Sequence, residues 1–418
     1  MASRIETSSN HLKVLGRFEL TDVRRFTAAL HILTARQGHE AVVLDFSDVG
    51  GAYLGPMAAV CVEILMLRSR PVRPVNARLV LPTQPRLATL FRNSNWAHLI
   101  DPDNHRSSTY KGYVNLPLIR FQNPQEQKKV VDQLVDAILC SMPVMDRLDV
   151  AAIEWALNEV TDNVLVHARS PIGGLVQMST FKTTRRVEFV VADGGAGIPS
   201  TMREGHPEIG EDIRALEQAV REGVTRDPKV GQGNGLYGTL EVARASEGTM
   251  HIYSCKARLD YENHELRLTR EDVPFRGTVL TASLDSSNAA ALGEALKFGD
   301  RKWIPLDYVE TRFESDTSDA LIFRLGQEAE SFGSRVAGEP VRTKLANIIQ
   351  MNLGRRVIVD LEGVPLISSS FADEVFGKLF VALGPLRFGQ VLDIRGVSAT
   401  VRSLIDKAIV QRSGSKDA

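Results

Sequence analysis

Apolar positions in the first part of the chain fall alternately into strand-like runs and helix-like periods. The apolar run 41–46 predicts a buried strand, and residues 55–69 predict a helix. A second strand and a second helix are predicted at 77–81 and 85–93. Strand, helix, strand and helix at this spacing predict a small α/β layer structure with parallel strands over residues 1–118.

The pattern then changes to longer helices that are followed by an apolar strand. Residues 115–121 predict a strand, and residues 125–139 predict an amphipathic helix. A second helix is predicted over 147–168, because apolar residues recur at the spacing of one helix face: Ile153, Leu157, Val160 and Val164. Residues 187–192 form an apolar run that is too continuous for an exposed loop and predict a buried strand.

The last third returns to short strands and helices after a predicted linker helix at 289–298. We expect strands at 320–325 and 356–361 and a helix from 334 through Met351. A helix start follows within 364–379, where serines precede two acidic residues. The sequence as a whole predicts an α/β (α+β) protein with three domains, at 1–118, 119–288 and 315–412, a linker region at 289–314 and a disordered polar tail at 413–418.

Composition narrows the class of protein. The chain has 418 residues, 43% hydrophobic and 24% charged, with a net charge of -1, so it lacks the basic field that attracts nucleic acid or anionic lipid. Its three cysteines stand far apart in apolar settings, which indicates neither a zinc site nor a disulfide framework. The longest apolar run, 53–67, is too short to span a bilayer, and we expect a cytoplasmic protein.

A column of polar side chains accompanies the predicted helix at 147–168. Glu159, Asn163 and His167 are four residues apart, which places them together on a face separate from the apolar one. A carboxylate beside an amide oxygen suits Mg²⁺, which takes one or two protein oxygens along with substrate phosphates. The carboxylate could instead orient an attacking water or hydroxyl, and a merely solvated polar stripe is the simpler alternative.

Two glycine-rich blocks follow. Asp193 ends the strand at 187–192 and precedes Gly194, Gly195 and Gly197, which permit close backbone approach to a ligand, while its carboxylate suits an amino group such as that of adenine. The second block runs directly into a helical pattern that begins with Leu236, and its glycines are Gly231, Gly233 and Gly235. Glycines before a helix start expose N–H groups that can cradle phosphate.

The order and spacing of these blocks resemble the GHKL ATPases, the gyrase, Hsp90, histidine kinase and MutL relatives, over about residues 120–285. The segment 276–281 is similar to their final Gly-Thr strand. The resemblance implies a Bergerat-type domain that binds ATP and Mg²⁺. By this resemblance Asn163 holds Mg²⁺, Glu159 is the catalytic base, Asp193 and Thr278 contact adenine, and a nucleotide-binding group completes the site: Gly195, Gly197, Gly231, Gly233, Gly235, Leu236, His167 and Lys229. The segment 199–230 is implied to be a lid, in which Arg226 and Lys229 are the cations nearest the phosphate loop.

The flanking parts resemble STAS domains. The N-terminal resemblance rests on layout and on Asp45 at the end of a strand; the usual phosphorylated hydroxyl is absent there, since 51–56 offers only Tyr53. Residues 315–412 resemble the STAS-like family of unassigned function, in which an Asp strand precedes a Ser-Phe-Ala-Asp-Glu helix start. Ser370 aligns with the phosphorylated serine of anti-sigma-factor antagonists, and Ser369 is a second possible phosphoacceptor. Helix capping by Ser368 to Ser370 is the alternative.

These resemblances imply a signalling protein closest to the anti-sigma-factor serine kinase branch. The expected activity is phosphoryl transfer to a protein serine, or slow ATP hydrolysis that repositions the STAS-like domains. The alternative is an ATP-gated interaction module with negligible turnover. The expected partners are ATP and a regulatory protein, with a homodimer possible, no membrane, and nucleic acid disfavoured by the near-neutral charge.

Overall fold

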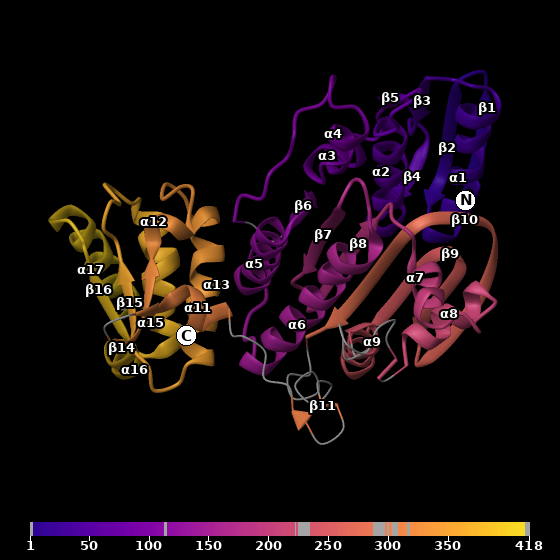
Figure 1. Cartoon of the computed structure of the whole chain (residues 1–418). Helices are drawn as coiled ribbons and strands as arrows, with labels where there is room; N and C mark the ends of the chain where they lie inside the picture. The colour runs from indigo at the N-terminus through magenta and orange to yellow at the C-terminus, as the bar shows by residue number, and fades with distance from the viewer. Residues whose placement is uncertain are drawn as a thin grey trace.

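A computed structural model gives the structure of the chain (Figure 1). It describes residues 3–112, 115–221, 223–224, 235–286, 297–298, 301–302, 308–315 and 318–413. Within these ranges the strands form two five-stranded sheets, one four-stranded sheet and one two-stranded ribbon. Helices accompany all three larger sheets, so the predicted α/β (α+β) fold class is confirmed.

The N-terminal sheet has the order β1-β2-β3-β5, with β4 paired to β2. Its strands are β1 (Arg4–Ser8), β2 (His11–Phe18), β3 (Ala41–Asp45), β4 (Val49–Ala52) and β5 (Asn76–Val80). Strands β2, β3 and β5 run parallel, as the strand and helix alternation predicted. The main helices of this part are α1 (Val23–His31), α2 (Leu54–Arg68), α3 (Pro85–Asn93) and α4 (Trp96–Ile100). Sequence analysis did not identify β1, β2 or α1.

The central sheet is antiparallel throughout and has the order β6-β7-β8-β10-β9. Its strands are β6 (Leu116–Phe121), β7 (Gly174–Phe181), β8 (Arg186–Asp193), β9 (Thr249–Glu262) and β10 (Glu265–Asp285). The accompanying helices are α5 (Pro124–Ser141), α6 (Arg147–Asn163), α7 (Ile198–Gly205), α8 (Asp212–Ala219) and α9 (Gly235–Ala245). The predicted elements at 115–121, 125–139 and 187–192 are therefore confirmed to within two residues.

The two faces of the central sheet are covered by different parts of the chain. Because side chains alternate along a strand, β8 directs Val187, Phe189 and Val191 to one face, where they join the core beneath α5, α6 and α9. Val190 and Ala192 point to the opposite face and share a core with α2 of the N-terminal part. The N-terminal part thus packs directly on the back of the central sheet (Figure 1).

The C-terminal sheet combines the parallel strands β14, β15 and β16 with an antiparallel edge strand β13. These strands are β13 (Glu314–Ser315), β14 (Ser318–Arg324), β15 (Val357–Asp360) and β16 (Leu392–Arg395). The helical segments are α11 (Tyr308–Phe313), α12 (Leu325–Glu328), α13 (Arg335–Met351), α14 (Ser369–Ala372), η4 (Asp373–Gly377), α15 (Lys378–Leu383), α16 (Pro385–Val391) and α17 (Ala399–Ser413). Helix α13 packs on α5, which joins this part to the central one (Figure 1).

The predicted linker helix at 289–298 needs a correction at its end. Lys297–Phe298 form strand β11, which pairs antiparallel with β12 (Arg301–Lys302), so these two residues are not helical. Backbone pairing with β12 decides the conformation of these two residues, and the apolar spacing from which the helix was predicted does not. The rest of that predicted helix, residues 289–296, lies outside the described residues, as does most of the predicted tail at 413–418. Among the helices of the described ranges, none has the length and apolar character needed to cross a bilayer.

Candidate functional site

The polar column begins on α6, a helix whose start is fixed by a side-chain cap. Asp146 accepts a hydrogen bond from the Leu148 amide at 2.8 Å, which satisfies one of the amide groups left open at a helix N-terminus. The regular α-helix ends at Asn163 and continues as a π-helical turn, η3 (Val164–Ala168). Glu159 and Asn163 keep the predicted four-residue α-helical spacing. The wider π turn rotates His167 out of line with Glu159 and Asn163. Nothing in the sequence of residues 164–168 predicted this π turn.

The predicted loop after β8 docks against the end of this π turn. The Ala196 amide donates to the Ala168 carbonyl at 2.8 Å. A Cβ atom at Gly195 would lie 2.0 Å from the same carbonyl oxygen, so only glycine permits this approach. The Gly194 amide donates to Ser170 Oγ at 3.2 Å. The polar-column segment and the first glycine block are therefore in direct contact.

Asp193 stands at the end of β8 with its carboxylate almost fully enclosed, 3% exposed. The Gly195 amide donates to Asp193 Oδ1 at 2.7 Å. Across the sheet Asp193 is paired with Thr278 of β10. Burial raises the pKa of Asp193 to about 7, against hydrogen bonds from Gly195 and Thr278 that lower it. A buried carboxylate that accepts few hydrogen bonds from the protein is stabilised strongly by a ligand that donates one.

A serine of β9 supports the other side of Asp193. Ser254 Oγ donates to the Gly277 carbonyl at 2.8 Å, lies 3.0 Å from Thr278 Oγ1 and accepts from the Ile198 amide at 2.9 Å. Gly277 has φ of +103°, and a Cβ there would lie 2.0 Å from the Asp193 carbonyl oxygen. Gly197 also has positive φ, +80°, and ends the loop at the start of α7. The loop, β9 and β10 thus form one hydrogen-bonded unit around the carboxylate.

The start of α9 approaches the polar column from the other side. A Cβ atom at Gly235 would lie 2.5 Å from Glu159 Oε2, so the carboxylate lies directly against the first residue of that helix. Burial, followed by the nearby charge of Asp162, raises the pKa of Glu159. Leu236 lies half-buried in the first turn of α9. The other predicted members of this block and its neighbouring cations lie outside the described residues: Gly231, Gly233, Arg226 and Lys229.

The structure therefore brings together segments that lie far apart in sequence. Glu159 meets Gly235, Gly195 meets the end of η3, and Asp193 is paired with Thr278. The predicted lid contains α7 and α8 in its described part, and α8 lies against β9 and β10. One end of this arrangement holds the buried hydrogen-bond acceptor Asp193. The other end holds the Glu159 carboxylate and the Asn163 amide of α6, close to the start of α9.

The predicted phosphoacceptors lie in the C-terminal part. Ser368 is the N-cap of α14, because its Oγ accepts from the Phe371 amide at 3.0 Å, and Ser370 Oγ lies 3.0 Å from Ser368 Oγ. Ser369 is exposed. The capping function that the sequence offered as an alternative is therefore present for Ser368. Helix α14 packs against α13 and α17 within its own part of the chain, so the structure does not unite these serines with the residues of α6 and β8.

The acidic residues after these serines are all paired with cations. Arg412 binds Asp373 through Nε at 2.7 Å and through a terminal guanidinium nitrogen at 2.8 Å, and Arg335 contacts it at 2.9 Å. Glu374 is buried and contacts Arg342 at 3.1 Å and Lys378 at 2.6 Å. Four cations therefore surround the first turns of this helix, a feature that spacing alone did not indicate.

Two residues next to the site were missed by sequence reasoning. Met66 of α2 occupies the space beside Gly194, where a Cβ atom would lie 2.4 Å from its Sδ. Ser254 bridges the loop and β10, as described above. Met66 lies in a helix that is apolar nearly all round, and Ser254 is one hydroxyl in a long strand, so neither carries a local sequence signal.

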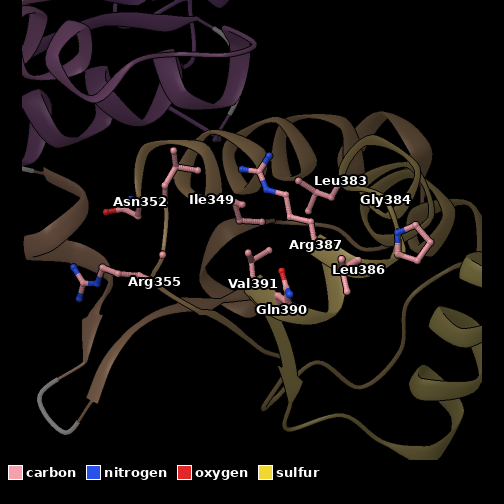
Figure 2. Close-up of a pocket in the computed structure, with 12 residues that line it drawn as sticks. Ile349, Asn352, Arg355, Leu383, Gly384, Leu386, Arg387, Gln390 and Val391 are labelled. Carbon is pink, nitrogen blue, oxygen red and sulfur yellow. The ribbon is translucent and has the colours of Figure 1, made fainter.

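A separate cavity of about 600 Å³ lies in the C-terminal part, between the end of α13 and α16 (Figure 2). Its lining is largely apolar, with Leu353, Leu383 and Leu386 beside the side chains of Arg355 and Arg387. None of the predicted site residues lines it. Within the described residues, no group of three or more His, Cys, Asp or Glu side chains is arranged to hold a metal ion.

Comparison with known proteins gives one positive result. Residues 337–402 match the model of a family described as a STAS-like domain of unknown function (DUF4325). A search of curated proteins found no match to the chain. The match begins in α13, covers the serine-bearing helix start and ends in α17, within the predicted domain at 315–412. The C-terminal part of this chain is therefore similar to the STAS-like domains of that family.

Proposed function

We propose that the central part of the chain binds ATP with Mg²⁺ as a GHKL-type domain and serves a signalling function. One observation carries the proposal: the buried Asp193 carboxylate, supported by Gly195 and Thr278, lies in the same unit as the α6 column and the start of α9. Structural packing alone gives no reason to bury a carboxylate whose pKa is raised to about 7. A ligand that donates a hydrogen bond there would compensate for that burial.

The residues present fit an adenine nucleotide. In its ionised form Asp193 accepts hydrogen bonds only, which matches the exocyclic amino group of adenine. The loop at Gly195 is held against the Ala168 carbonyl, and Thr278 Oγ1 lies 3.0 Å from Ser254 Oγ, so that a hydroxyl stands beside the carboxylate. This donor and acceptor set supports recognition of a base rather than of a free phosphate.

The other end of the site fits phosphates and a hard cation. Asn163 would supply an amide oxygen for Mg²⁺, which takes few protein ligands when phosphates complete its shell. The start of α9 carries the positive end of a helix dipole, and an anion there would be stabilised. Bound Mg²⁺ supplies charge neutralisation during phosphoryl transfer. Glu159, one helical turn before Asn163, would orient the attacking oxygen and accept its proton.

Two reactions use this arrangement. A protein serine, with Ser370 or Ser369 as candidates in this chain, would attack the terminal phosphorus, and ADP would leave as the bond between the phosphorus and the bridging oxygen breaks. Water would do the same in slow hydrolysis. Since α14 packs on α13 and α17, transfer to Ser370 requires either movement of the C-terminal part or a second copy of the chain.

The deciding experiment incubates full-length protein with Mg²⁺ and γ-labelled ATP and follows both labelled protein and free phosphate. Label on protein that disappears in Ser370→Ala indicates a serine kinase, and free phosphate that disappears in Glu159→Ala indicates an ATPase. Equilibrium binding of ATP to Asp193→Asn tests the site itself, and we expect a loss of at least tenfold in affinity. Wild-type protein that fails to bind ATP would falsify the proposal.

An ATP-gated interaction module is the second candidate, favoured by one contact. Met66 of the N-terminal part touches the loop at Gly194, so occupancy of that loop could be communicated to the flanking part without chemistry. ATP binding with neither labelled protein nor free phosphate would select this candidate.

A further inference from the structure

A cleft of about 680 Å³ lies on the back of the central sheet, where the N-terminal part leaves that face uncovered. Its floor is formed by β8, β9 and β10, and one wall is the outer part of the β9–β10 hairpin, which curves beside α1 (Figure 1). The opposite wall consists of the connection after β2 and the first turn of α2. The cleft is separate from the proposed nucleotide site, which lies at the ends of the strands and along α6.

The floor carries polar groups that the protein does not satisfy. Ser283 is 8% exposed, and its hydroxyl has no hydrogen-bond partner. Glu188 is paired with Ser283 across the sheet and is half-buried. Within the described chain no hydrogen bond or ion pair reaches its carboxylate, although the charge of Arg186 acts on it and partly offsets the burial that raises its pKa. Leaving a buried polar group unpaired costs about 1–3 kcal/mol. These side chains therefore need water or a ligand as a partner.

The far wall presents a positive end. Helix α2 is 15 residues long and starts at Leu54, and Tyr53 at its N-cap makes no side-chain capping bond. The amides of Leu54 and Gly55 are left for another acceptor, whereas Pro56, the third residue of the helix, has no N–H group. The helix dipole also favours an anion at this end. Arg17 donates to the Tyr53 hydroxyl beside this end and adds a guanidinium group, which also makes a 3.9 Å exposed ion pair with Glu19.

The two ends are fixed relative to each other by the sheet. A Cβ atom at Gly55 would lie 2.6 Å from Thr281 Cγ2, so the α2 end sits over Thr281. Thr281 and Ser283 are two residues apart on β10 and lie on the same face of the sheet. Because Glu188 of β8 is directly opposite Ser283, Thr281 is its diagonal neighbour, and diagonal neighbours are separated by roughly 7–8 Å. Among the other charged groups that line the cleft, Asp260 accepts from Arg258 at 2.8 Å and contacts His251 at 2.9 Å, and Arg267 contacts Glu265 at 3.9 Å. Glu262, a further lining carboxylate, is exposed to solvent.

We propose that this cleft binds a small zwitterion. The ammonium group of the ligand lies against the Glu188 carboxylate and the Ser283 hydroxyl, and its carboxylate lies against the α2 N-terminus and Arg17. A short aliphatic spacer joins the two groups. The site stands on groups outside the proposed nucleotide site, and its test does not require ATP.

Calorimetric titration of the full-length protein with 4-aminobutyrate, butyrate and butylamine tests the proposal, because the last two each lack one of the charges. We expect saturable binding of 4-aminobutyrate and at least tenfold weaker binding of both single-charge analogues. Glu188→Gln and Ser283→Ala should each weaken binding of 4-aminobutyrate, the former by at least tenfold. Glu330→Gln, which changes an exposed carboxylate of the C-terminal part, should have no effect.

Three results would overturn the proposal. Butyrate that binds as tightly as 4-aminobutyrate would make the cleft a simple anion site. Unchanged affinity in both Glu188→Gln and Ser283→Ala would place the ligand elsewhere. An absence of saturable binding at millimolar 4-aminobutyrate would mean that water alone satisfies the floor.

Discussion

Lys344 of α13 is completely buried and forms an ion pair with Asp136 of α5. A second carboxylate, Glu328 of α12, contacts the same ammonium group. Tyr110, from the segment that precedes the central sheet, donates to Asp136 Oδ2 at 2.9 Å. Burial opposes ionisation of Asp136, but Lys344, Arg312 and the Tyr110 hydroxyl together outweigh it and hold the pKa of Asp136 below its usual value. One carboxylate therefore ties the C-terminal part to the central part.

Replacing Lys344 by Met should strongly weaken this junction. The substitution keeps most of the side-chain volume but removes the buried ammonium group between Asp136 and Glu328, which then share only the partly exposed Arg312. Breaking a buried pair costs about 3–5 kcal/mol, and the remaining cation should place the loss near the lower end of that range. We expect earlier loss of the α13–α5 contact in urea, measured by hydrogen–deuterium exchange of the backbone amides of α13. Lys182→Met is the matched control, because Lys182 makes an exposed ion pair with Glu339 across the same junction and should cost only about 0–1 kcal/mol. Equal effects of the two substitutions would contradict the importance of the buried network.

Affinity for adenine ligands should depend on pH through Asp193. Its pKa is raised to about 7 in the free protein, and the ionised form accepts the amino hydrogen bond more strongly than the protonated carboxyl group does. Affinity should therefore be constant above this pKa and fall as pH drops through 7, approaching roughly tenfold per pH unit. Titrations with ATP and with adenosine, which has no phosphate to titrate, should share this fall.

Asp149→Asn provides the control for that measurement. Asp149 lies in the first turn of α6, and burial likewise raises its pKa to about 7, but it is remote from the loop at Asp193. The pH profile of adenosine binding should be unaltered in this variant. A profile that changed with Asp149→Asn, or one that stayed flat between pH 6 and 8 in the wild type, would assign the titration to another group.

The local spacing of apolar residues predicted the helices and strands of this chain better than it predicted how they pack together. Strand and helix periods located α3 at its observed bounds and β8 within one residue, because both are decided by burial of one face. The π turn that displaces His167 has no characteristic composition, and its last residue contacts the loop at Gly195. The packing of α2 on the back of the central sheet and the burial of Lys344 arise from contacts between distant segments, and neither is encoded at any single spacing.

Gly195→Ala should damage the nucleotide site directly. A methyl group there would lie 2.0 Å from the Ala168 carbonyl oxygen, so the loop must move away from η3 and carry the Gly195 amide off Asp193. We expect at least a tenfold loss in ATP affinity, measured at equilibrium. Gly210→Ala is the matched control, since no atom lies within 4 Å of its added methyl group, and it should bind ATP like the wild type. Normal binding by Gly195→Ala would show that the loop is not part of the site.

Substitutions of Ser368 and Ser370 should distinguish helix capping from phosphorylation, although the two hydroxyl oxygens are only 3.0 Å apart. Ser368→Ala removes the N-cap of α14 and should destabilise the C-terminal part by about 1 kcal/mol, while labelling from γ-labelled ATP persists. Ser370→Ala leaves that cap in place and should change stability by less than about 0.5 kcal/mol, while it abolishes the label. A phosphate on Ser370 would meet Asp373 and Glu374, which Arg335, Arg342, Lys378 and Arg412 already neutralise, so the cations offset the repulsion that the acidic residues alone would cause. Thermal unfolding of both variants, together with their labelling from γ-labelled ATP, shows which serine caps the helix and which is phosphorylated. Label retained in Ser370→Ala and lost in Ser368→Ala would reverse their assignment.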